Sequence, residues 1–136
     1  MDMRVAELLL RGAGGEPVDF ARTIVSHGVA ELGPNRVDLA MQTLETTLPV
    51  PRGARTLRVT QGAGELRVEV VAGSFHDQLT DTLAHMFRLD DDLSGFYELV
   101  RDDELSWCTT GAGRMLRAPT VFEDVVKTRC TPIRRR

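Results

Sequence analysis

The chain has 136 residues, which is enough for one ordinary domain and few for two. Its hydrophobic fraction of 42% and charged fraction of 27% are typical of a globular protein, and no apolar run approaches the roughly 20 residues of a membrane span. The net charge is -3, but five of the 17 basic residues occupy the last ten positions. Residues 1–126 are therefore strongly acidic, which disfavours nonspecific binding to nucleic acid.

The N-terminal quarter predicts a strand followed by a helix. Residues 5–10 are apolar enough for a short buried strand, but the stretch is too short for a signal peptide and Glu7 interrupts it, so we expect a cytoplasmic location. Asp19 is a candidate cap for a helix that carries Phe20 on its apolar side and ends near Gly28.

Alternation of apolar and polar residues then predicts an antiparallel sheet. A first strand is expected around residues 37–41, closed by the prolines that follow it. Two clearer alternating runs, 57–60 and 66–70, flank a Gly-rich hairpin loop at 61–64. Each run has one apolar face, so one face of the sheet has to be covered.

After Gly73 the apolar residues take the period of helices. They recur at i, i+4, i+7 and i+8 from Leu79 to Phe87, and further helices are predicted at 93–100 and 105–108. A sheet followed by helices is the pattern of an α+β protein.

A last helix is predicted from Thr120, because Glu123 stands at capping-box spacing from it. This helix carries an apolar stripe made of Phe122, Val125, Val126 and Cys130. The stripe has to fold back on the body, pair with another chain or stay exposed.

Local motifs predict no catalytic residue, metal site or cofactor. The chain holds three Gly-Ala-Gly triplets, none of which extends to a dinucleotide-binding fingerprint, so turns explain them. The three histidines and two cysteines lack metal-ligand spacing. Residues 90–95 begin like a calcium loop, but Arg101 stands where the loop needs a carboxylate, so we expect Asp91 or Asp92 to cap a helix instead.

Three stretches, in this order, resemble the helix-hairpin-helix DNA glycosylases, and in particular bacterial 3-methyladenine DNA glycosylase II and 8-oxoguanine DNA glycosylase. They are residues 18–28 (VDFARTIVSHG), 87–97 (FRLDDDLSGFY) and 117–128 (RAPTVFEDVVKT), called the glycosylase-like segments below. The last of them is the most specific.

The resemblance implies an antiparallel sheet with helices, similar to the TATA-binding-protein repeat, over residues 1–75. It implies the first helices of an incomplete all-α domain over residues 76–131, and a basic tail outside the family pattern at 132–136. The family flips a damaged base out of duplex DNA and cleaves its glycosidic bond in base excision repair. Alkylated purine is the preferred substrate class over 8-oxoguanine.

The sequence departs from the family pattern after Thr131, where Pro132 cannot continue the helix. The hairpin and the catalytic aspartate have no counterpart, so we expect a truncated glycosylase-like chain that is inactive alone and binds double-stranded DNA weakly. Two alternatives stay open: an independent protein-binding module, and a small dimer that self-associates through the helix from Thr120 to Cys130.

The resemblance also suggests which residues would lie near DNA. Arg114, Arg117, Lys127 and Arg129 are near the face that approaches DNA in the family, although surface charge for solubility explains them equally well. Ser26 and His27 stand where the first helix leads toward the rim of the base pocket. A role at the helix end is the stronger interpretation of these two.

Overall fold

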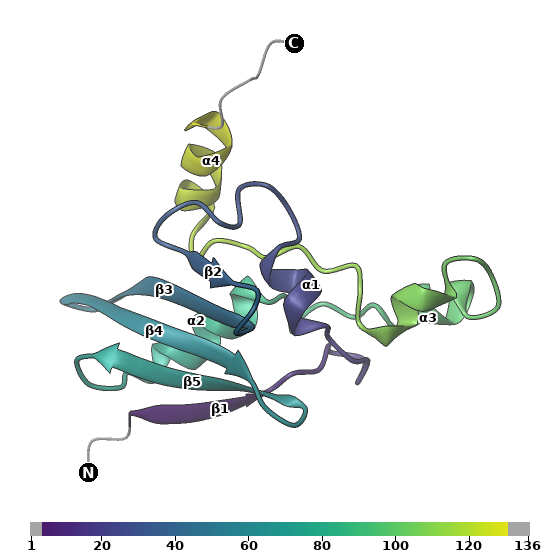
Figure 1. Ribbon diagram of the computed structural model, residues 1–136, viewed down its shortest axis with the longest axis horizontal. Coiled ribbons are helices and arrows are strands. Elements are labelled where there is room, and N and C mark those ends of the chain that lie inside the picture. Colours follow the sequence, from purple (N-terminus) through teal and green to yellow (C-terminus); the bar gives the residue numbers. More distant parts are fainter. Residues whose placement is uncertain (1–3, 131–136) are drawn as a thin grey trace.

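A computed structural model describes residues 4–130, and its centre is an antiparallel sheet of five strands (Figure 1). In chain order the strands are β1 (Val5–Leu9), β2 (Arg36–Asp38), β3 (Thr43–Val50), β4 (Gly53–Gln61) and β5 (Glu65–Ala72). Their order across the sheet is β1-β5-β4-β3-β2, so every pair of neighbours is antiparallel and the three longest strands form a meander.

The helices follow the expected order, which confirms the α+β class. They are α1 (Phe20–Ile24), α2 (Gln78–Met86), α3 (Ser94–Val100), the 3-10 helix η1 (Ser106–Thr110) and α4 (Val121–Cys130). In Figure 1, α2 lies across one face of the sheet, α3 lies beyond the sheet at one side, and α4 projects away from the body. The longest helix within residues 4–130 is α4, with ten residues, about half the length that a membrane span needs.

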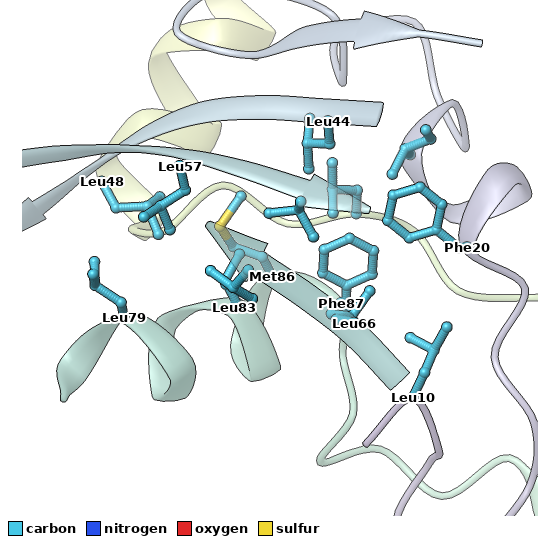
Figure 2. Packing of buried hydrophobic residues seen from close by; sticks show 14 of the residues in the cluster. Leu10, Phe20, Leu44, Leu48, Leu57, Leu66, Leu79, Leu83, Met86 and Phe87 are labelled. Carbon is cyan, nitrogen blue, oxygen red and sulfur yellow. The ribbon is translucent and has the colours of Figure 1, made fainter. Parts of the chain in front are cut away.

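The core lies between the sheet and α2 (Figure 2). Leu57 and Leu66 from the sheet are fully buried together with Leu83 from α2, and full burial of such a side chain stabilises the fold by roughly 1.5–3 kcal/mol. The rings of Phe20 and Phe87 stack with their centroids 5.7 Å apart, which ties α1 to the end of α2. The expected division after residue 75 thus falls just before a helix that shares the core of the sheet.

Of the two helix caps predicted at aspartates, the one at Asp19 is confirmed. The Asp19 carboxylate accepts a hydrogen bond from the Arg22 amide at 2.9 Å, as a cap of α1 does. The predicted cap of α3 at Asp91 or Asp92 is wrong, because the N-cap is Leu93 and carries no side-chain cap bond. Asp92, one residue earlier, accepts a hydrogen bond from the Ser94 amide at 2.9 Å. However, α1 ends at Ile24, four residues before the predicted end at Gly28.

The predicted strand at 37–41 is wrong in its extent. β2 stops at Asp38, and Leu39 and Met41 lie in the following turn, where they are 55% and 73% exposed. The strand that fills this part of the sheet is β3. Its inward positions include Thr46, which is fully buried, and a polar residue among the inward positions weakens the alternation that marks a strand.

Candidate functional site

The glycosylase-like segments, far apart in sequence, meet in one place. Phe20 of the first stacks on Phe87 of the second, and Arg117 of the third lies 3.6 Å from the carboxylate of Asp91 in the second. The chain entering the third segment also binds the first, because the Leu116 amide donates to the Ser26 hydroxyl at 2.8 Å. We call the meeting point of these segments the junction.

Backbone groups at the start of the third segment, and at Leu116 just before it, also bond to the other parts of the junction. The Arg117 amide donates to the carbonyl of Met86, the last residue of α2, at 2.8 Å. His27 Nε2 lies 2.7 Å from the Leu116 carbonyl oxygen. Since a carbonyl accepts, this nitrogen carries the proton in the contact. Ser26 and His27 thus hold the backbone that leads to α4.

A buried ion pair fixes the polar side of the junction. Arg114 Nη2 lies 2.5 Å from Glu16 Oε1, and the two side chains are 1% and 4% exposed. The same Glu16 oxygen accepts the amide of Leu93 at 2.7 Å, just before α3. The Arg114 guanidinium also donates to the carbonyls of Arg88 and Asp91, so it connects the loop after α2 with the N-terminal turn.

The environment keeps Glu16 ionised. Burial alone would raise the pKa of the Glu16 carboxyl, but hydrogen bonds from the backbone amides of Leu93 and of Glu16 itself, together with the Arg114 guanidinium, hold the pKa below its usual range. A carboxylate with a lowered pKa is a poor proton donor near neutral pH. Glu16 is therefore a structural anion.

Arg114 does not lie where the DNA-contact prediction placed it. The prediction assumed a solvent-facing cation, but the residue is only 4% exposed and its guanidinium is engaged inside the fold. A phosphate would have to break this buried network before it could bind the side chain. We correct Arg114 to a structural residue.

Arg117 is the predicted DNA contact closest to the junction. Its side chain is 29% exposed and lies 3.8 Å from Asp90 and 3.6 Å from Asp91, while the imidazole of His85 is 3.3 Å away. Since guanidinium only donates, His85 Nδ1 is the acceptor in that contact. Two carboxylates already neutralise this cation, which lowers its attraction for phosphate.

The remaining predicted contacts both lie on α4. Lys127 is buried, with its ammonium 2.9 Å from the Glu123 carboxylate one turn earlier. Arg129 is exposed near the end of the helix. Arg117 and Arg129 are thus the predicted contacts that keep some access to solvent.

α4 is placed with its polar side toward the body. Its one buried residue is Lys127, and its N-terminus is held by a hydrogen bond from the Glu123 amide to the Thr120 hydroxyl, as predicted. The apolar stripe faces outward instead. Its residues, with the adjoining Val121, are exposed as follows: Val121 75%, Phe122 78%, Val125 54% and Val126 41%, while Cys130 is also exposed.

Several hollows lie on the surface of the described residues. One is lined by residues from the start of α1 and the strand ends around it, including Arg11, Asp19 and Gln61. A second lies beside α3, where Glu98 and Arg101 reach it. Within residues 4–130, no group of three or more His, Cys, Asp or Glu side chains is arranged to hold a metal ion.

Sequence reasoning missed Glu16 altogether and missed the structural role of Arg114. Glu16 stands in a glycine-rich turn and its partner lies 98 residues later, so no local spacing could connect them. The exposed Trp107 was also missed. Its ring lies 5.2 Å from the Arg22 guanidinium, a cation–π contact that links η1 to α1.

Comparisons with protein-family models, with curated proteins and with solved structures find no match to this chain. The resemblance to the helix-hairpin-helix glycosylases therefore stays a prediction.

Proposed function

We propose that this chain is the non-catalytic sheet-and-helix part of a DNA glycosylase-like protein of the helix-hairpin-helix family, with a role in base excision repair of alkylated purines. The five-stranded antiparallel sheet backed by α2 is compatible with the TATA-binding-protein-like part that the resemblance implies. The role in base excision repair and the TATA-binding-protein-like topology of the sheet are both part of this proposal.

The observation that carries the proposal is the junction. Three segments that resemble one family by sequence also meet in space. The Phe20–Phe87 stack joins the first to the second, and the Arg117–Asp91 ion pair joins the second to the third. Ser26 and His27 of the first bond to the backbone of Leu116, the residue just before the third. Chance similarity gives no reason for such segments to be neighbours in space. A core inherited from the family would explain why these segments are neighbours, because residues that pack together constrain each other.

The chemistry of the described residues argues for a supporting role. A glycosylase needs a carboxyl group placed to assist departure of the base, yet the buried carboxylate at the junction is neutralised by Arg114 and has a lowered pKa. We therefore assign to these residues the positioning of a helical catalytic part, and no bond cleavage.

Direct DNA contact is limited in this proposal. Of the four predicted contacts, Arg117 and Arg129 keep access to solvent, and two cations can neutralise only a few phosphates. We expect DNA affinity to come mainly from the part that carries the hairpin.

The test is a fusion. The chain is joined to the helical catalytic part of a 3-methyladenine DNA glycosylase II from which the N-terminal sheet region has been removed. We expect the fusion to form abasic sites in duplexes containing hypoxanthine, and to prefer them over duplexes containing 8-oxoguanine. The catalytic part alone, and the same part joined to an unrelated domain of similar size, serve as controls. A fusion that unfolds cooperatively yet is no more active than these controls would contradict the proposal.

One observation favours a second function, that of an independent protein-binding or self-associating module. The apolar stripe of α4 is exposed, although a soluble protein usually buries a stripe of this kind. The fusion experiment separates the two, since a module of this kind would not restore base excision.

A further inference from the structure

β1 is an edge strand of the sheet. It pairs with β5 on one side, and Figure 1 shows no helix or strand of the described residues beyond its other side. Two backbone hydrogen bonds at the ends of β1 fix its register. The Val70 amide donates to the Arg4 carbonyl at 2.8 Å, and the Leu10 amide donates to the Gly64 carbonyl at 3.0 Å. Together they show which residues of β1 bond to β5.

Half of the backbone groups of β1 point away from the sheet. In an antiparallel ladder the hydrogen-bonded pairs recur at every second residue. Between the two bonds that fix the register, Ala6 and Leu8 are therefore the residues that bond to β5. Val5, Glu7 and Leu9 direct their N–H and C=O groups to the open side. Among residues 4–130, no hydrogen-bond partner reaches these groups.

The two edges of the sheet differ in how they are protected. Proteins commonly prevent unwanted pairing at an edge by a very short strand, by charged side chains or by a bulge. The opposite edge strand, β2, has three residues, of which Arg36 and Asp38 are charged and exposed. β1 has five residues in uninterrupted register, and its side chains that face away from α2 include Val5 and Leu9, which are 37% and 63% exposed. β1 is thus the edge that can accept a further strand.

The charges on the face of the sheet away from α2 indicate what that strand carries. On this face charges alternate from strand to strand, since Arg58 of β4 lies 3.8 Å from Glu45 of β3 and 3.9 Å from Glu69 of β5. One row along, Arg67 of β5 stands opposite Glu7 of β1. The Glu7 carboxylate is exposed and has no ion-pair partner among the described residues. A basic side chain beyond Glu7 would continue the alternation.

We propose that the free edge of β1 binds an extended segment of another protein as a sixth, antiparallel strand, with a lysine or arginine opposite Glu7 and apolar residues opposite Val5 and Leu9. The three residues would exchange about six backbone hydrogen bonds with it. A second copy of β1 is less complementary, because pairing along its whole length places Glu7 opposite Glu7, and like charges directly opposite are destabilising. This inference does not rest on the proposed function.

The first test uses a labelled probe peptide, acetyl-Lys-Val-Thr-Lys-Thr-Val-Lys-amide, and fluorescence anisotropy. We expect weak binding, because a single short strand buries less than a standard protein interface of roughly 1,200 Å². A methyl group on the amide nitrogen of the central lysine removes a donor that faces β1, and should weaken binding by about 10-fold or more. The same group on the preceding threonine, whose amide points away, should change little. Equal loss from the two, or no binding of the parent peptide at millimolar concentration, overturns the proposal.

The second test exchanges the charges. Glu7→Lys should weaken binding of the probe by roughly 5-fold, and a peptide with glutamate in place of the central lysine should then bind this variant better than wild type. Glu104→Lys is the matched control, because it makes the same change of charge at an exposed residue after α3. Circular dichroism checks that both variants keep the fold. A probe that binds both variants equally well overturns the role of Glu7 and with it the proposal.

The third test follows amide hydrogen exchange by NMR. In the free chain the amides of Ala6 and Leu8 should exchange slowly and those of Val5, Glu7 and Leu9 rapidly, and addition of the probe should slow the latter three. Exchange at these three that the bound probe leaves unchanged would place the peptide elsewhere and overturn the proposal. If they are already slow in the free chain and become fast on dilution, a second copy occupies the edge, which also overturns it.

Discussion

Replacing Arg114 by methionine should cost more stability than almost any other polar substitution in this protein. The methionine keeps most of the length of the side chain but leaves the Glu16 carboxylate, which is 4% exposed, without its cation. Breaking a buried pair on one side costs about 3–5 kcal/mol, because an uncompensated charge stays in the interior. The carbonyls of Arg88 and Asp91 each lose the guanidinium donor as well, and keep only a backbone amide.

Urea unfolding followed by circular dichroism measures this cost. With a slope of about 1.5 kcal/mol per molar urea, the midpoint of Arg114→Met should fall by roughly 2–3 M. Arg101→Met is the matched control, because Arg101 pairs with Glu98 while both side chains are more than 60% exposed. Such a pair contributes at most about 1 kcal/mol. If both variants shift the midpoint equally, the buried pair does not hold the junction, and the reasoning is refuted.

The same pair predicts a pH dependence. The pKa of Glu16 is lowered in the folded protein, so its contribution to stability is fully present above the ordinary carboxyl pKa of about 4.3. As pH falls below that value, the unfolded chain binds the proton first, and the contribution is lost until the pH passes the lowered folded pKa. Unfolding free energy measured from pH 6 down to pH 3 should therefore fall less steeply in Glu16→Gln than in wild type. Parallel curves would contradict the assignment.

Three further outcomes follow from the described contacts and the sequence. Gly111→Ala should be strongly destabilising, because its φ is +122° and the added Cβ would lie 2.4 Å from the backbone nitrogen of Asp19, the cap of α1. Gly28→Ala is the control: its Cβ would meet open space, so its thermal unfolding should be close to that of wild type. Thr46→Val should lower the free energy of unfolding in urea by about 1–3 kcal/mol, because the buried side-chain oxygen Oδ1 of Asn35 loses the Thr46 hydroxyl that donates to it at 2.7 Å. Deleting residues 134–136, which lie outside the described residues, should remove most of the weak DNA affinity in fluorescence anisotropy; submicromolar binding unchanged by the deletion would argue against this.

Strong periodicity made parts of the fold predictable. The β4–β5 hairpin and α2 were placed correctly, because Leu57, Val59 and Leu66 alternate cleanly with polar residues and the apolar side of α2 repeats with a helical period. Where tertiary contacts override local pattern, prediction failed. Thr46 is an inward residue whose hydroxyl is satisfied by Asn35, and a sequence pattern cannot foresee that such a position is buried.

The junction was predictable only in outline. The family resemblance identified the segments that meet there, but it led to the expectation that Arg114 faces solvent. A charged residue in the sequence does not show whether an oppositely charged side chain, here that of Glu16, will be buried beside it. The stripe of α4 shows the same limit in another form. Periodicity identified the apolar face of the helix, but it did not predict that this face is exposed while Lys127 is buried.

The proposal that these residues support a glycosylase without cleaving the bond themselves is tested most directly by base release from the isolated chain. Purified protein is incubated with duplexes that each carry one 3-methyladenine, hypoxanthine or 8-oxoguanine, and abasic sites are counted after strand cleavage with alkali. The account predicts a count equal to that of the protein-free control for every lesion. Abasic sites above this background, removed by heating the protein first, would show a catalytic group in the chain and contradict the account.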